Sequence, residues 1–210
     1  SIVLNEDSYA KAHAYRPKCS LIPAFIAPSE QEPLPSDIDA TLKNLTENFE
    51  LMFCTNAYGF SFDKNGQEIY GIFDLIECFS KLGSHALHIS DDSGAYQREL
   101  RQRNIVLPAN IALSSQRHSF FEVLRRSDCM IRATTTDGDS LSIREALFLG
   151  KGVIASDCVS RPKGCLSFQT GDQEQLFRAI EEFEPYLANP VKQDFAEEIF
   201  HLYQTLCNST

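Results

Sequence analysis

The sequence predicts an α/β protein whose core is a parallel sheet with helices on both faces. Three observations predict this fold. Short apolar runs of strand length, such as 50–55 and 85–90, alternate with longer segments whose apolar residues follow helical spacing. Within the run 50–55, residues 51–54 are all apolar, as in a strand that is covered on both faces. Residues 129–156 form a strand, a polar loop, a helix and a second strand, which is the crossover unit of a parallel sheet.

Composition narrows the range of functions. The chain has 210 residues, enough for one domain with attachments or two small ones. Its formal net charge of −10 argues against a nucleic-acid partner. No apolar run reaches the roughly 18 residues of a membrane span. The seven cysteines lack a Cys-x-x-Cys pair, so neither a structural metal nor a disulfide framework is expected, and a reducing cytoplasmic location follows.

The first 49 residues precede the expected core. Within 1–28, the sequence predicts a short strand, a helix at 7–15 and a strand at 19–22. We interpret 29–49 as a linker, because residues 28–39 hold three prolines and four acidic residues. A short helix at 38–45 is expected at its far side.

The core domain is predicted to span 50–184, with strands and helices in alternation. Strands are predicted at 50–55, 85–90, 110–114, 129–133 and 153–156. Helices are predicted at 72–82, 96–103, 119–126, 141–149 and 171–183, the last with an Asp172/Gln175 capping box. Residues 185–210 begin with prolines and end in a helix at 196–206. The loop 56–70 is long for a compact domain, which favours a functional role.

The polar loop at 134–140 is the candidate ligand site. Its seven residues directly precede a helix start, where free N–H groups and the positive end of the helix dipole can bind phosphate. Asp137 lies in this loop and Glu145 eight positions further on, inside the helix. Glu145 shares a helix face with Leu141 and Ser142, so its side chain can point towards the loop. The alternative is purely structural: Ser142 and Glu145 form a capping box, and the aspartates are ordinary turn residues.

These residues carry a resemblance to a known family. Asp137-Gly138 through Glu145-Ala146-Leu147, followed by Gly-Lys-Gly-Val-Ile-Ala-Ser-Asp at 150–157, resembles the donor-site motif of the family-four retaining glycosyltransferases of the GT-B fold. That motif is a Glu, seven residues, a second Glu-Ala and a Gly-Lys-Pro-Val-Ile-Ala-Ser run. The Asp-Gly-Asp-Ser-Leu-Ser-Ile-Arg-Glu form resembles the bacterial polysaccharide and O-antigen branch. The resemblance extends more weakly over about 51–183.

The sequence departs from the family motif at three positions. Asp137 is one methylene shorter than the usual Glu, Asp139 stands where an apolar or aromatic residue is common, and Gly152 replaces the proline. Family members also place an arginine after the first core strand and a Lys-Gly pair before the next helix. Here Asn56 stands near the arginine position and Tyr70-Gly71 at the Lys-Gly position.

The resemblance implies a role for each residue of the site. Asp137 is the expected catalytic residue and faces the donor sugar, while Glu145 binds the ribose hydroxyls. The remaining expected donor-binding residues contact the phosphates, the sugar or the base: Gly138, Asp139, Ser140, Leu141, Asn56, Lys64, Leu113 and Ser114. Of these, Lys64 is the only basic residue in its loop and is expected to supply charge to the diphosphate, the alternative being a solvated turn residue. Arg161 either reaches the mouth of the site or lies in an exposed turn.

As a whole, the resemblance implies a Rossmann-like donor-binding domain, the C-terminal half of a GT-B enzyme. Such an enzyme transfers a hexose or N-acetylhexosamine from a nucleotide sugar, here expected to be UDP-linked, without a metal or other cofactor. The acceptor is a saccharide or a lipid-linked sugar of cell-surface polysaccharide or lipopolysaccharide, at the cytoplasmic face of the inner membrane. The acceptor-binding N-terminal domain is then a missing partner, so the chain alone is expected to be an incomplete enzyme. Residues 1–28 form its tail, and 185–210 pack back across the junction.

Other functions remain open. A nucleotide-sugar epimerase of the same fold is one, and a non-catalytic nucleotide-binding or interaction domain is another. Asp91-Asp92 suggests a phosphoryl-receiver module, but the pair follows the second core strand, whereas such a module needs it after the first. The same pair is a candidate Mg²⁺ site, although a helix cap is the favoured interpretation.

Overall fold

The computed structural model describes residues 2–185 and 194–207. Its core is a six-stranded parallel sheet in the order β5-β4-β3-β6-β7-β8. The strands are β3 (Leu51–Asn56), β4 (His85–Ser90), β5 (Ile111–Ser114), β6 (Cys129–Arg132), β7 (Gly152–Ser156) and β8 (Leu166–Phe168). The predicted parallel sheet is therefore confirmed.

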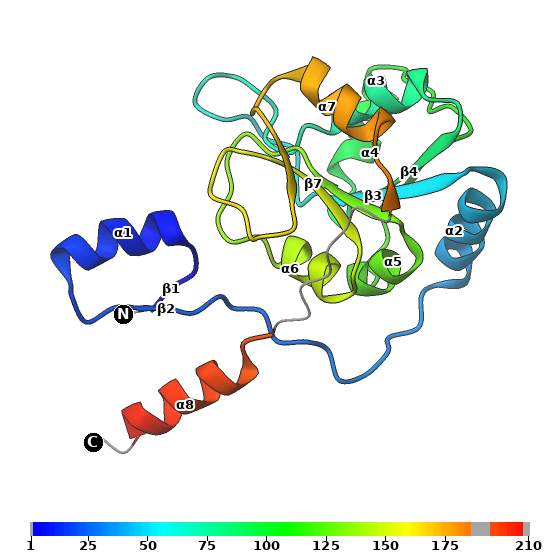
Figure 1. Cartoon of the computed structure of the whole chain (residues 1–210). Helices are drawn as coiled ribbons and strands as arrows, with labels where there is room; N and C mark the ends of the chain where they lie inside the picture. Colours follow the sequence, from blue (N-terminus) through cyan, green and yellow to red (C-terminus); the bar gives the residue numbers. More distant parts are fainter. Residues whose placement is uncertain (1, 186–193, 208–210) are drawn as a thin grey trace.

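Helices cover both faces of this sheet (Figure 1). One face carries α3 (Ile72–Lys81), α4 (Ala95–Gln102) and α7 (Gln173–Glu181); the other carries α2 (Ser36–Asn48), α5 (Phe120–Arg126) and α6 (Leu141–Phe148). Successive residues of β3 point to opposite faces, so Phe53 packs in the first layer while Met52 and Cys54 pack in the second. Two apolar layers on one sheet explain why the strands are apolar throughout.

Two elements differ from the prediction. The predicted linker at 29–49 contains α2, a 13-residue helix that buries Ile38, Leu42 and Leu45 against the sheet. The acidic residues and prolines before α2 dominate the local composition, although its apolar residues follow helical spacing. Because α2 packs on the sheet, the sheet domain begins ahead of residue 50. Strand β8 is absent from the prediction, because it is three residues long and exposes Leu166 and Ser167 at the edge of the sheet.

The N-terminal residues form a separate small unit (Figure 1). Strands β1 (Ile2–Val3) and β2 (Ser20–Leu21) pair in parallel and are joined through α1 (Glu6–Tyr15). This unit contacts the sheet domain where the Asp7 carboxylate accepts hydrogen bonds from the backbone N–H and hydroxyl of Ser160, at 2.9 and 3.0 Å.

The C-terminal helix α8 (Ala196–Cys207) leaves the sheet domain on the same side as the N-terminal unit (Figure 1). It has no buried residue, and Phe200, Tyr203 and Leu206 are exposed. Of the predicted C-terminal segment, residues 186–193, with Pro190, and 208–210 lie outside the described residues. No described helix has both the length and the apolar character needed to cross a bilayer.

Candidate functional site

The site lies where the strand order of the sheet changes direction. From β3 the chain proceeds to β4 and β5 on one side, whereas β6, β7 and β8 follow on the other side. Connections on either side of such a switch point separate and leave a crevice beyond the carboxyl ends of the two central strands, where open α/β sheets bind ligands. Asn56 ends β3 and Arg132 ends β6, so these two residues mark the switch point.

Side chains from two other elements contact Asn56, and Tyr70 packs on one of them. The Oδ1 atom of Asn56 accepts a hydrogen bond from the hydroxyl of Ser142, at the start of α6, at 3.1 Å. It also lies 3.4 Å from Nη1 of Arg132, as does the backbone oxygen of Asn56. The ring of Tyr70 packs 5.4 Å from the same guanidinium group. Asn56 is thus at the predicted position, in contact with an arginine that another strand supplies.

Asp137 is held by two arginines. Arg132 donates to its two carboxylate oxygens at 3.1 and 3.2 Å, and Arg161 donates to Oδ2 at 2.8 Å. The side chains of Asp137, Arg132 and Arg161 are only 8%, 13% and 4% exposed. Burial raises the pKa of Asp137, but the hydrogen bonds and charges of the two guanidinium groups outweigh burial and bring this pKa below its ordinary value. The Asp137 carboxylate is therefore ionised at neutral pH.

The helix that follows Asp137 has an open N-terminus. Ser140, the N-cap of α6, makes no capping hydrogen bond with its side chain, and the first turn holds no acidic residue. By contrast, the start of α3 is closed, because Glu68 accepts hydrogen bonds from the N–H groups of Ile72 and Phe73 at 2.8 and 3.2 Å. Of the two helices at the switch point, only α6 presents free N–H groups to an anion.

Glu145 lies in the second turn of α6, and its carboxylate has no hydrogen bond or ion pair within the described part of the chain. The capping box with Ser142 is not formed, because the N-cap of α6 is Ser140 and Ser142 lies inside the helix, where its hydroxyl donates to Asn56. Burial raises the pKa of Glu145 above its ordinary value, since no cation compensates the loss of water. A half-buried carboxylate without a partner can accept hydrogen bonds from ligand hydroxyl groups.

Three other predicted residues, Lys64, Leu113 and Ser114, make no contact with Asn56 or Asp137 among the described residues. Lys64 is exposed in a turn that Asp63 closes by accepting from the N–H groups of Asn65 and Gln67. Leu113 and Ser114, at the end of β5, line a cavity of about 220 Å³. The structure therefore brings together Asn56, Asp137, Gly138, Ser140, Leu141 and Glu145, but not Lys64.

The side chain of Asp139 has a different surrounding. It accepts two hydrogen bonds from Nε of Arg144, at 2.7 and 2.9 Å, and is only 4% exposed. This pair lines a cavity of about 360 Å³ between the sheet domain and the N-terminal unit. Only the backbone of Asp139 therefore belongs to the α6 start.

Arg132 is a site residue that was not predicted, and the position of the Arg161 side chain was left open. Arg132 is the one charged residue of the predicted strand 129–133, at its carboxyl end, and this could have marked it. Arg161 is buried, with Nε donating to the backbone oxygen of Ser156 at 2.7 Å, so the exposed-turn interpretation is wrong for its side chain. Two buried cations thus lie at the site, whereas Lys64, the basic residue of the loop 56–70, does not.

Metal ligands do not cluster here. Asp91 accepts hydrogen bonds from the Tyr96 N–H at 2.8 Å and the Ser93 hydroxyl at 2.6 Å, which makes it a helix cap as favoured. Residues 2–185 and 194–207 contain no group of three His, Cys, Asp or Glu side chains that could hold a metal ion.

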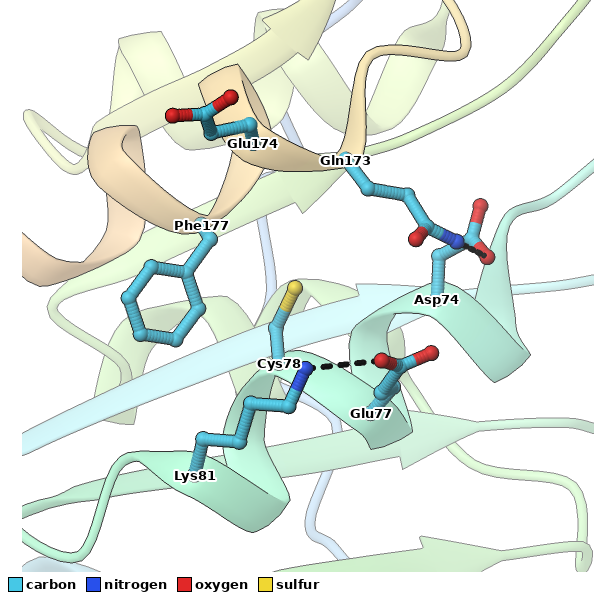
Figure 2. Close-up of a pocket in the computed structure, with 7 residues that line it drawn as sticks. All are labelled: Asp74, Glu77, Cys78, Lys81, Gln173, Glu174 and Phe177. Atoms are coloured by element: carbon cyan, nitrogen blue, oxygen red, sulfur yellow. Dashed lines mark hydrogen bonds and ion pairs between the residues drawn. The ribbon is translucent and has the colours of Figure 1, made fainter.

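A further cavity, of about 280 Å³, lies between α3 and α7 on the outer surface (Figure 2). Its lining residues, among them Cys78 and Phe177, include none of the predicted site residues.

The fold was compared with known proteins. No protein-family model matches the sequence, and no curated protein matches it either. Among solved structures, sucrose-phosphate synthase from Thermosynechococcus elongatus superposes with a TM-score of 0.69 at 18% identity, over 100% of this chain and 58% of that chain. Anabaena Alr3699/HepE in complex with UDP and glucose superposes with a TM-score of 0.69 at 16% identity, over 99% of this chain and 62% of that chain.

A third similar structure is "Trehalose-6-phosphate from E. coli bound with UDP-2-fluoro glucose". It superposes with a TM-score of 0.58 at 14% identity, over 81% of this chain and 45% of that chain. This chain spans about three fifths of the length of the first two proteins. The parallel sheet with helices on both faces is common to them. The chain has the fold of a GT-B glycosyltransferase domain.

Proposed function

We propose that this chain is the donor-binding domain of a retaining glycosyltransferase that uses a UDP-linked hexose or N-acetylhexosamine. The observation that carries the proposal is the open N-terminus of α6 at the switch point, with two buried arginines beside it and Glu145 one turn inside. A diphosphate fits the N–H groups and guanidinium groups, and ribose hydroxyls fit the Glu145 carboxylate. Two of the similar structures are complexes with UDP and glucose or with UDP-2-fluoro glucose, which supports this choice of ligand.

The chemistry follows from where charge develops. As the sugar leaves, negative charge builds on the diphosphate and positive charge on the sugar ring. Fixed N–H dipoles and guanidinium groups stabilise the departing diphosphate without a metal ion. The Asp137 carboxylate, ionised at neutral pH, orients the sugar and stabilises its positive character.

The acceptor is assigned to a domain that this chain lacks. The paired strands β1 and β2 are too few to form a stable sheet on their own. We assign them to the tail of an N-terminal acceptor-binding domain, with α8 packing back across the junction. The acceptor is then a saccharide or a lipid-linked sugar of cell-surface polysaccharide synthesis, reached from the cytoplasmic face of the membrane. On this proposal the chain binds donor but does not transfer sugar alone.

Nucleotide titration tests the proposal. The chain is titrated calorimetrically with UDP, UDP-glucose, UDP-N-acetylglucosamine and GDP, with Mg²⁺ and with EDTA. We expect UDP and at least one UDP-sugar to bind equally well in both conditions and more tightly than GDP. Amide chemical shifts should change at residue 56 and at 138–145 but not around Lys64.

Two results would contradict it. Absence of binding to every nucleotide would favour a non-catalytic interaction domain. Release of free UDP or an epimerised sugar without acceptor would favour an epimerase of the same fold.

A further inference from the structure

In the free protein, the Asp137 carboxylate is paired with Arg132 and Arg161, the two cations that a diphosphate would need. Both guanidinium groups direct N–H donors at its carboxylate, within 3.2 Å. Two arginines and one carboxylate leave one uncompensated positive charge, in a place that is largely shielded from water. The open end of α6 adds further positive potential. The site is thus poised for an anion of higher charge than a carboxylate.

The two arginines are held in ways that permit a change of partner. Arg161 is anchored at Nε, which donates to the backbone oxygen of Ser156, and at Nη2, which lies 3.2–3.4 Å from side chains of Thr134, Ser156 and Cys158. Its Nη1, which contacts Asp137, is the part that can take another partner. Among the described residues, the hydrogen-bond contacts of Arg132 Nη1 are long, at 3.4 Å, and both are with Asn56. Guanidinium groups bind carboxylate and phosphate oxygens with the same forked geometry, and the more highly charged diphosphate competes well.

We propose that Asp137 serves as an internal stand-in for the diphosphate, and that donor binding transfers Arg132 and Arg161 from this carboxylate to the diphosphate oxygens. The inference rests on the proposed function and assigns the diphosphate cations to these two arginines instead of Lys64. It also gives the exchange a consequence for catalysis. While two guanidinium groups neutralise Asp137, its carboxylate cannot stabilise a positive sugar ring. Once they move to the diphosphate, the full negative charge of Asp137 faces the reaction.

The test is the affinity of Asp137→Asn for pyrophosphate and for UDP, measured by calorimetry. A residue that merely supports the site would lower these affinities when changed. A carboxylate that competes for the arginines should instead raise both when neutralised, by about tenfold if one charge-assisted contact is released. Arg132→Met should weaken both by a similar factor.

The matched control is Asp128→Asn. Asp128 lies at the opposite end of β6 from Arg132, where its carboxylate accepts a hydrogen bond from the N–H of Met52 at 2.8 Å. This variant has the same change of net charge but leaves the arginines paired, so its affinities should equal those of the wild type. If pyrophosphate and UDP bind more tightly to both variants by the same factor, the cause is the change of net charge, and the inference is overturned.

The outcomes separate this inference from the proposed function. If the wild type binds UDP and Asp137→Asn binds it no more tightly, the exchange is wrong and the donor site stands. If Asp137→Asn tightens both probes, but UDP binds no better than pyrophosphate to any variant, the exchange stands and the nucleoside proposal falls. Binding of neither probe to any variant overturns both.

If Asp137→Asn does not fold, the exchange is tested in the wild-type protein. The ¹³C signal of the Asp137 carboxyl is titrated with and without pyrophosphate. Loss of the arginines should raise the pKa of Asp137 in the complex, because these cations hold it low in the free protein. An unchanged pKa with pyrophosphate bound would overturn the exchange.

Discussion

Glu145→Gln should stabilise the free protein and weaken UDP binding at the same time. Glu145 is half-buried and its carboxylate has no partner among the described residues, so its negative charge loses hydration without compensation. Burial raises its pKa, which means that the folded protein binds a proton at Glu145 more tightly than the unfolded chain does. At neutral pH the ionised group therefore lowers the free energy of unfolding.

The size of both effects follows from this environment. Removing the uncompensated charge while keeping the shape should raise the free energy of unfolding by about 1 kcal/mol, within the range of single stabilising substitutions. For a chain of this size, that corresponds to a rise in Tm of about 2–4 °C. The lost charge-assisted hydrogen bonds to ribose should weaken UDP binding roughly 10- to 100-fold.

Thermal unfolding and calorimetry measure the two effects. The gain in the free energy of unfolding should be complete at pH values above the raised pKa of Glu145. It should vanish as the pH falls below the ordinary pKa of a glutamate, because position 145 is then uncharged in both the wild type and Glu145→Gln. Glu122→Gln is the control. Its carboxylate is paired with Nε of Arg125 at 3.2 Å on α5, so the change should not raise Tm or alter UDP binding. A lower Tm for Glu145→Gln, or unchanged UDP affinity, would refute the reasoning.

Two further predictions concern the framework of the sheet. Gly152→Pro, which restores the family residue, should lower the free energy of unfolding by about 3 kcal/mol or more. A Cβ at 152 would lie 2.3 Å from the ring of Phe183, and proline would lose the hydrogen bond of the Gly152 N–H to Asp128 at 3.0 Å. Urea unfolding measures this loss of stability. In a Phe183→Ala protein, Gly152→Pro should lower the free energy of unfolding by less, because the ring is absent. An equal loss with and without the Phe183 ring would contradict the clash. Separately, burial, with the nearby charge of His118, lowers the pKa of His88 to about 3, so the unfolded chain gains a proton at acidic pH that the folded protein does not. Stability should therefore fall by about 2 kcal/mol between pH 7 and pH 5, and His88→Leu should remove that part of the pH dependence in urea unfolding; an unchanged slope would contradict it.

The sheet could be predicted because its signals are local. Strands β3, β4 and β6 are buried runs of mainly apolar residues, and each is followed by a helix with one apolar face. The same reasoning failed at β8, where two of three residues are exposed and no pattern forms. It underestimated α2 because prolines and acidic residues dominate the composition of its surroundings, although Ile38, Leu42 and Leu45 follow helical spacing.

The candidate site was predictable only where its residues are close in sequence. Asp137 and Glu145 lie in one loop and the helix after it, so their spacing carries the signal. Of the partners of Asp137, Arg132 lies only five positions earlier, at the end of β6, where no motif marked it. Arg161 lies 24 positions later, in a loop beyond β7, so its contact with Asp137 depends on tertiary structure. Within the loop 56–70 the sequence offered Lys64 alone, whereas the sheet brings Arg132 beside Asn56 from a position 76 residues along the chain.

The strand order also shapes how the protein folds. Strands β3, β4 and β5 are consecutive in the chain, and so are β6, β7 and β8, so each half-sheet can assemble through short connections. The pairing of β3 with β6 instead closes a long loop, as the bond from Met52 to Asp128, 76 residues apart, shows. Loop-closure entropy makes this seam the slowest pairing to form. Because the proposed nucleotide lies across the seam, with Asn56 on one half and α6 on the other, it would bind only the joined halves and would oppose their separation by mass action.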